Sequence, residues 1–207
     1  MKPWLFDILA CPIDKHFPLD LYIFSLETDI NQIQQFIQTH KERKLSKIKK
    51  ENIIQIIEEK GNFKIKDAIV LQKTPIKEYL STILESIGEL SNFTDKTEKK
   101  IVKSCVDLIS TEVKEKIEQI SADAKINQIE EVLPELYLIN KFKLEIEIKS
   151  GLLFCKKCNR WYPIIDTIPQ MLPDEYRDEK KELQFLKSKK NLLDSEFINQ
   201  DLKPFNL

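Results

Sequence analysis

Two cysteines separated by two residues are the clearest chemical signal in this sequence. Cys155 and Cys158 enclose two lysines and lie between two segments with strand-like patterns. A tight turn that presents two thiolates in this way is typical of a zinc knuckle. A structural zinc site needs four ligands, and the segment around Cys11 is the natural source of the others, because it also offers Asp14 and His16.

The fourth ligand of such a site is open at this point. We expect His16 to join the three cysteines, because imidazole is a commoner ligand than carboxylate in structural zinc sites, and Asp14 is the alternative. Two other interpretations of Cys155 and Cys158 also stay open, namely a redox pair and a site without metal. A redox role is less favoured, because the pair lies at a strand turn and not at the start of a helix, where the pKa of a thiol is lowered.

Composition limits the classes of protein that this chain can belong to. It has 207 residues and 42% hydrophobic content, enough for one or two domains. Its net charge of -1 gives no global basic field, so binding to nucleic acid or anionic lipid would need a local patch. With only three glycines, the chain lacks the glycine-rich turns that hold nucleotide phosphates or a methyl-transfer cofactor. We therefore expect no independent enzyme and assign no catalytic residue.

The N-terminal segment indicates the cellular compartment of the protein. Its apolar run is interrupted by Asp7, and no small-residue cleavage site follows, so we expect neither a signal peptide nor a membrane span. A close cysteine pair in a chain without such a signal favours metal or redox chemistry in a reducing compartment over a structural disulfide. We expect a cytoplasmic protein with no membrane partner.

The periodicity of apolar residues predicts strands at both ends of the chain and helices between them. Residues 19–26 are apolar at nearly every position, which indicates a strand covered on both faces. From residue 29 to 140 apolar residues recur at helical spacing, including a predicted helix that begins near Ser46 and ends at Gly61. Between Phe142 and Ile148 the period changes to two, which predicts a strand with one wet face.

These patterns predict an α+β fold class. A small split zinc-ribbon-like β domain is expected to be formed by both chain ends, with an all-helical insertion domain between them. The expected bounds are residues 1–28 and 141–173 for the β domain, 29–140 for the insertion, and 174–207 for a C-terminal tail that is partly helical.

Five short motifs at the ends of the chain carry a family resemblance. They are Trp4-Leu-Phe-Asp-Ile-Leu-Ala-Cys-Pro12, Phe17-Pro-Leu19, Gly151-Leu-Leu-Phe-Cys-Lys-Lys-Cys158, Arg160-Trp-Tyr-Pro-Ile164 and Ile168-Pro-Gln-Met-Leu-Pro-Asp-Glu175. Together they resemble the small zinc-ribbon-like activator subunit shared by methyltransferases of the translation machinery, the multifunctional methyltransferase subunit family. The resemblance covers residues 1–28 and 141–173, and larger eukaryotic members carry a helical insertion at the same point.

This resemblance implies a non-catalytic role in protein–protein complexes. Members of the family bind and stabilise class I-like catalytic subunits that methylate tRNA, rRNA or release factor, as heterodimers with several alternative partners. S-adenosylmethionine and RNA would then be reached only through the partner. Zinc-binding members use two cysteine pairs; here Cys11, Cys155 and Cys158 match, and His16 stands where a second N-terminal cysteine appears in some members.

We expect a partner-binding surface near the C-terminal motifs, which hold more large apolar residues than a small domain can bury. Contact is expected through apolar side chains and strand addition. The candidate residues are Leu5, Phe6, Trp161, Ile164, Ile165, Ile168, Met171 and Leu172. The alternative for each of them is a place in the core. The alternative function is a zinc-ribbon nucleic-acid-binding or transcription-associated module, which predicts a basic face at Lys156, Lys157 and Arg160.

Overall fold

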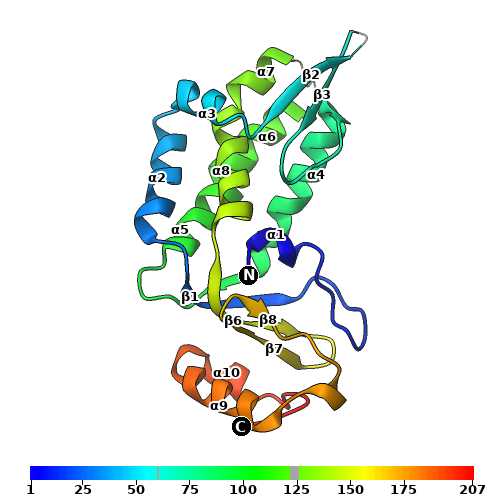
Figure 1. Cartoon of the computed structure of the whole chain (residues 1–207), viewed down its shortest axis with the longest axis vertical. Helices are drawn as coiled ribbons and strands as arrows, with labels where there is room; N and C mark the ends of the chain where they lie inside the picture. Colours follow the sequence, from blue (N-terminus) through cyan, green and yellow to red (C-terminus); the bar gives the residue numbers. More distant parts are fainter. Residues whose placement is uncertain (60, 122–125) are drawn as a thin grey trace. The chain divides into compact units, whose positions relative to one another are not determined.

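The chain divides into two compact units (Figure 1). The computed structural model describes residues 1–59, 61–121 and 126–207. Unit 1 comprises Met1–Glu27, Asn92–Lys100 and Glu147–Leu207, and unit 2 comprises Thr28–Ser91 and Ile101–Ile146. Helices and sheets both occur, so the predicted α+β class is confirmed.

Unit 1 is built on a five-stranded sheet with the strand order β5-β1-β6-β7-β8. The strands are β1 (Asp20–Leu26), β5 (Phe93–Asp95), β6 (Ile148–Cys155), β7 (Arg160–Ile165) and β8 (Ile168–Pro169). The helical segments are α1 (Pro3–Phe6), η3 (Asp174–Tyr176), α9 (Glu179–Lys189), η4 (Lys190–Leu192) and α10 (Ser195–Ile198). β1 pairs antiparallel with β6, so segments from both ends of the chain share the centre of this sheet.

The C-terminal segment covers one face of the sheet in unit 1. Successive strand residues point to opposite faces, and Phe24, Phe154 and Trp161 lie on the same side. These aromatic residues pack with buried residues of the segment, including Leu186 and Phe197. These two residues belong to α9 and α10, which lie beside the sheet in Figure 1. The tail predicted to be partly helical is thus an ordered part of the core of unit 1.

Gly151 allows the three central strands to lie close together. It pairs with Ile23 of β1 and with Ile164 of β7. A Cβ atom on Gly151 would lie 2.7 Å from the carbonyl oxygen of Tyr22, nearer than real Cβ contacts come. Any larger residue would therefore push β1 and β6 apart at the centre of the sheet.

Unit 2 combines helices with a second sheet of strand order β2-β3-β4. Its helical segments are α2 (Ile30–Lys41), α3 (Leu45–Glu51), α4 (Ile76–Gly88), η1 (Glu89–Asn92, whose last residue falls in unit 1), α5 (Ile101–Leu108), η2 (Ile109–Val113), α6 (Lys114–Ser121), α7 (Ile126–Glu131) and α8 (Leu133–Glu145). Its strands are β2 (Gln55–Glu59), β3 (Asn62–Lys66) and β4 (Thr74–Pro75).

The insertion is therefore not all-helical. The helix predicted from Ser46 to Gly61 is confirmed only as far as Glu51, and the rest of that prediction is wrong. α3 ends at Glu51 because Asn52 adopts a left-handed conformation, with φ 50°. The isoleucines that follow, including Ile56 and Ile57 of β2, are β-branched and favour a strand. Residue 60 and residues 122–125, which the expected insertion also included, lie outside the described residues.

The strand predicted between Phe142 and Ile148 is also wrong over most of its length. α8 continues to Glu145, and β6 begins at Ile148. α8 is buried from Leu133 to Lys143, on every side of the helix, so its apolar residues show no helical stripe. The alternation of Phe142, Leu144 and Ile146 therefore gave a false strand signal.

Unit 1 also contains a segment that the sequence interpretation placed in the insertion. Phe93–Asp95 forms β5 and pairs in parallel with β1, with Tyr22 opposite Thr94. A three-residue strand without periodic context carries no signal of its partner in the sequence. The compact units thus differ from the expected bounds at residue 28, at residues 92–100 and at residues 141–146, and the expected tail at residues 174–207 is part of unit 1.

Candidate metal centre and exposed apolar surface

A tight turn after α1 holds the N-terminal half of the candidate metal centre. The backbone N–H of Lys15 donates to the carbonyl oxygen of Cys11 at 2.9 Å, and the N–H of Cys11 donates to the carbonyl oxygen of His16 at 3.0 Å. Lys15 adopts a left-handed conformation, with φ 58°. These two bonds close the loop and place Cys11 and Asp14 in one turn.

The β6–β7 hairpin supplies the other half. Cys155 ends β6 and pairs with Arg160 at the start of β7, so Cys158 lies in the turn between the strands. Asn159 follows in a left-handed conformation, with φ 54°, which asparagine adopts more readily than most residues. The register of the hairpin therefore sets the two thiols side by side.

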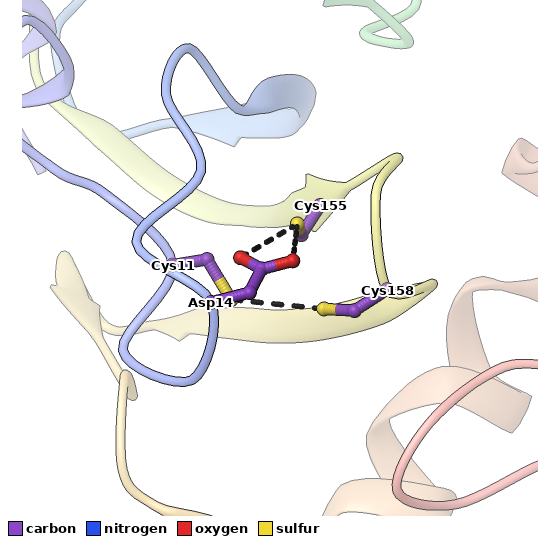
Figure 2. Close-up of side chains that lie close together, drawn as sticks. All are labelled: Cys11, Asp14, Cys155 and Cys158. Carbon is purple, nitrogen blue, oxygen red and sulfur yellow. Dashed lines mark hydrogen bonds between the residues drawn. The ribbon is translucent and has the colours of Figure 1, made fainter.

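The ligand atoms of Cys11, Asp14, Cys155 and Cys158 all lie within 4.8 Å of one another (Figure 2). The Sγ atoms of Cys11 and Cys158 are 3.7 Å apart, and the Sγ of Cys155 lies 3.6 Å and 3.7 Å from the two carboxylate oxygens of Asp14. A tetrahedral site with zinc–sulfur bonds of about 2.3 Å has sulfur–sulfur edges of about 3.8 Å. The spacing of these sulfur and oxygen donors is close to that of a tetrahedral zinc site, and their chemistry is compatible with zinc.

Asp14, and not His16, is the residue that the structure brings to the three cysteines. The backbone N–H of His16 donates to a carboxylate oxygen of Asp14 at 3.0 Å and holds that side chain in place. The sequence contained a usable signal, because Cys11-Pro-Ile-Asp14 has the same two-residue spacing as Cys155-Lys-Lys-Cys158. Residue type alone had favoured histidine.

Hydrogen bonds to the carboxylate of Asp14 keep it ionised. Burial opposes its charge, but the N–H of His16 and the thiols of Cys11, Cys158 and Cys155 outweigh that effect and lower the pKa of Asp14 to about 2. The carboxylate is thus ready to accept a cation at any physiological pH.

The Cys155 thiol behaves in the opposite way. Burial is the main cause that raises the pKa of Cys155 to about 12. A thiol with so high a pKa is a poor nucleophile and a poor redox group, so the redox interpretation loses support. A cation that binds here must displace the thiol protons, which makes its affinity depend on pH.

Tyr162 is a contact of this centre that the sequence interpretation missed. Its hydroxyl group lies 3.3 Å from the Sγ of Cys11. Burial, followed by the contact with Cys11, raises the pKa of Tyr162 well above its ordinary value. Tyr162 therefore stays protonated and can donate a hydrogen bond to the Cys11 sulfur.

The expected partner-binding residues fall into two groups. Phe6, Trp161 and Ile164 are fully buried in the core of unit 1, while Leu5 and Met171 are partly buried. Ile165, Ile168 and Leu172 are 36%, 60% and 43% exposed. Only the last three present large apolar side chains to solvent, next to the outer strand β8.

Other exposed apolar residues of unit 1 were not foreseen. They are Trp4, Ile8, Ile13 and Phe17 in the N-terminal segment, Tyr176 after β8, and Leu192 and Leu207 further along the C-terminal segment. Of these, Trp4, Ile8 and Phe17 lie in motifs that had been interpreted as family markers and not as surface. So many large apolar side chains exposed to solvent on a small unit are typical of a protein-interaction surface.

The basic residues near Cys158 are mostly neutralised. Lys156 pairs with Asp20 at 2.7 Å, and Arg160 pairs with Asp174 at 2.8 Å. These carboxylates reduce the attraction of the hairpin for phosphate groups, so the basic face expected for a nucleic-acid-binding module is weak.

A sheet built from both chain ends, with two loops that gather thiols and a carboxylate, has the architecture of a zinc-ribbon-like module. The chain belongs to the Trm112p-like protein family, whose model matches residues 2–166. The recognition made from the terminal motifs is confirmed. Membership of this family supports a general role as a methyltransferase activator.

Comparison with curated proteins and with solved structures gave no match. Over the described ranges, no helix combines the length and apolar character needed to cross a membrane.

Proposed function

We propose that this protein is a non-catalytic activator and stabilising subunit of S-adenosylmethionine-dependent methyltransferases that act on tRNA, rRNA or release factor. It would form a heterodimer with a class I-like catalytic subunit in the cytoplasm, and several such subunits would be alternative partners. The match to the Trm112p-like family over residues 2–166 is the observation that carries this proposal.

The outer edge of the sheet in unit 1 supports a binding mode. β8 is the last strand of the sheet, so within the described residues no strand pairs with its outer side. Ile165 and Ile168 stand opposite each other on β7 and β8, and Leu172 follows. A partner strand that adds to β8 would complete backbone hydrogen bonds and remove these apolar side chains from water.

Replacing Ile168 and Leu172 by aspartate tests this surface. The double variant is expected to lose at least about 90% of co-purification with the methyltransferase, since two charges would be buried in an apolar contact. The measurement is the yield of catalytic subunit pulled down with the tagged chain from the native cell. The matched control is Leu192→Asp, which adds a charge at a residue of similar exposure away from β8. Undiminished recovery of the double variant would show that the interface lies elsewhere.

The same proposal assigns a structural zinc ion to Cys11, Asp14, Cys155 and Cys158. Bound zinc would fasten the N-terminal loop to the β6–β7 hairpin. The distances between the donors and the ionised state of Asp14 support this assignment.

Substitution of Asp14 and of His16 separates the two candidate ligands. Asp14→Asn is expected to lower zinc affinity more than about 100-fold, beyond what the loss of an outer-shell partner costs. His16→Ala is expected to keep the affinity within about threefold, because its contact with Asp14 is made by the backbone. Competition with a chromophoric chelator measures both. Zinc binding that survives in Asp14→Asn and is lost in His16→Ala would reverse the assignment.

A further inference from the structure

Asn159, which ends the turn, and the first two residues of β7, Arg160 and Trp161, are all held by the C-terminal segment. The backbone N–H of Lys203 donates to the carbonyl oxygen of Asn159 at 2.9 Å, and the N–H of Trp161 donates to the carbonyl oxygen of Lys203 at 3.2 Å. Between them, Arg160 forms two hydrogen bonds to one carboxylate oxygen of Asp174, at 3.1 Å and 2.8 Å. These three residues come directly after Cys158.

A second set of contacts fixes the segment itself. The buried guanidinium group of Arg177 donates to the carbonyl oxygen of Trp161 at 2.7 Å and pairs with Glu182 of α9. It also lies between 5.1 Å and 5.5 Å from the rings of Trp161, Tyr162 and Phe205. The indole N–H of Trp161 donates to the carbonyl oxygen of Phe205 at 3.0 Å. The segment is thus attached at both of its ends to the beginning of β7.

We propose that residues 174–205 act as a brace that positions the Cys155–Cys158 turn for metal binding. Cys158 is followed by a left-handed residue, a conformation that a free loop leaves easily. The contacts of the C-terminal segment with Asn159, Arg160 and Trp161 restrict that loop. The whole brace lies beyond residue 166, where the match to the family ends.

The brace restricts the hairpin before an ion binds. The hairpin therefore loses less conformational entropy when its metal ligands become ordered. An ion that binds to a loop already held in shape does not need to immobilise it, so affinity rises. Loss of the brace should therefore be seen in two ways, as faster opening of the turn and as weaker metal binding. The second readout depends on the proposed zinc site, and the first does not.

Two variants and two matched controls test the brace. A chain that ends at Leu202 loses Lys203 and Phe205 but keeps the buried Leu202, and its control ends at Phe205, which removes only exposed residues. Asp174→Asn weakens the hold on Arg160, and its control is Glu175→Gln at the exposed neighbouring residue. The measurements are amide hydrogen exchange of residues 158–161 without metal, and zinc affinity by chelator competition.

In the chain that ends at Leu202 and in Asp174→Asn, the Trp161 amide should exchange at least about tenfold faster and zinc should bind about tenfold more weakly, as for other lost outer-shell partners. Both controls should match the full chain. If the amide of Ile23 in β1 also exchanges faster in the shortened chain, the sheet itself has opened in that chain. The Asp174→Asn variant then decides whether the brace restricts the turn. Unchanged exchange at Trp161 in Asp174→Asn would overturn the proposal. If the full chain binds no zinc, the zinc assignment is wrong. The hydrogen-exchange measurement still tests whether the brace restricts the turn, because it is made without metal.

Discussion

Replacing Arg177 by methionine is expected to lower the free energy of unfolding of unit 1 by about 3–5 kcal/mol. The guanidinium group is fully buried, and its partner Glu182 is 8% exposed. Removal of the cation would leave the carboxylate of Glu182 buried without its partner, and it would also remove the stacking on Trp161. Urea unfolding followed by tryptophan fluorescence measures this, since Trp4 and Trp161 both lie in unit 1.

The double variant Arg177→Met with Glu182→Leu separates the two causes of that loss. If the unpaired carboxylate is the main cause, the second substitution should recover more than half of the lost stability, because two apolar side chains then replace a buried ion pair. A double variant no more stable than Arg177→Met would show instead that the stacking and the bond to Trp161 account for the loss.

Replacing Glu135 by glutamine is expected to destabilise unit 2 in a pH-dependent way. Glu135 has no exposed surface, and its Oε1 atom lies 2.8 Å from both Arg43 and Lys116 and 3.5 Å from His40. Burial opposes ionisation, but the contacts with His40, Lys116 and Arg43 outweigh it and lower the pKa of Glu135 to about 2. In the unfolded chain a glutamate has a pKa of about 4.3.

The sign of the pH effect follows from these two values. A carboxyl group with a lower pKa in the folded state adds stability above pH 4.3, and that contribution is lost as the pH falls toward 2. The shift corresponds to about 3 kcal/mol, but solvent screens the half-exposed Arg43 and Lys116, so we expect about 2 kcal/mol at pH 7. At pH 2 the variant and the parent chain should differ by less than about 1 kcal/mol.

Urea unfolding followed by the helical circular dichroism signal at several pH values measures this effect. The matched control is Glu130→Gln, which removes an exposed pair with Lys49 and should cost less than about 1 kcal/mol. A destabilisation by Glu135→Gln that is as large at pH 2 as at pH 7 would show that lost packing, and not the charge, is responsible.

The sequence predicted the kind of chemistry at the candidate metal centre better than it predicted which four residues form that centre. The Cys-x-x-Cys spacing is a local feature, since two residues between two cysteines set their distance whatever the rest of the chain does. The choice between Asp14 and His16 is not local. It depends on how the loop from Cys11 to His16 lies against the β6–β7 hairpin, because only that arrangement brings the carboxylate of Asp14 to 3.6 Å and 3.7 Å from the Sγ of Cys155.

The candidate partner-binding surface shows the same limit of prediction from the sequence. Trp161 and Ile168 carry similar signals in the sequence, because both are large apolar residues in neighbouring short motifs. Trp161 is buried under the C-terminal segment, whereas Ile168 stays exposed on the outer strand. Which of the two can meet a partner depends on which face the segment covers, and this is decided by residues about 25 to 45 positions away.

By itself, the sequence determined the α+β class, the family, the cysteine turn and the absence of a glycine-rich cofactor loop, because each of these follows from residue types at short spacing. The tertiary structure alone decided the strands β2 and β5, the helical end of α8, the place of Asp14 and the brace. Strand partners, complete burial of a helix and contacts between distant segments depend on the whole core, and local periodicity carries no signal for them.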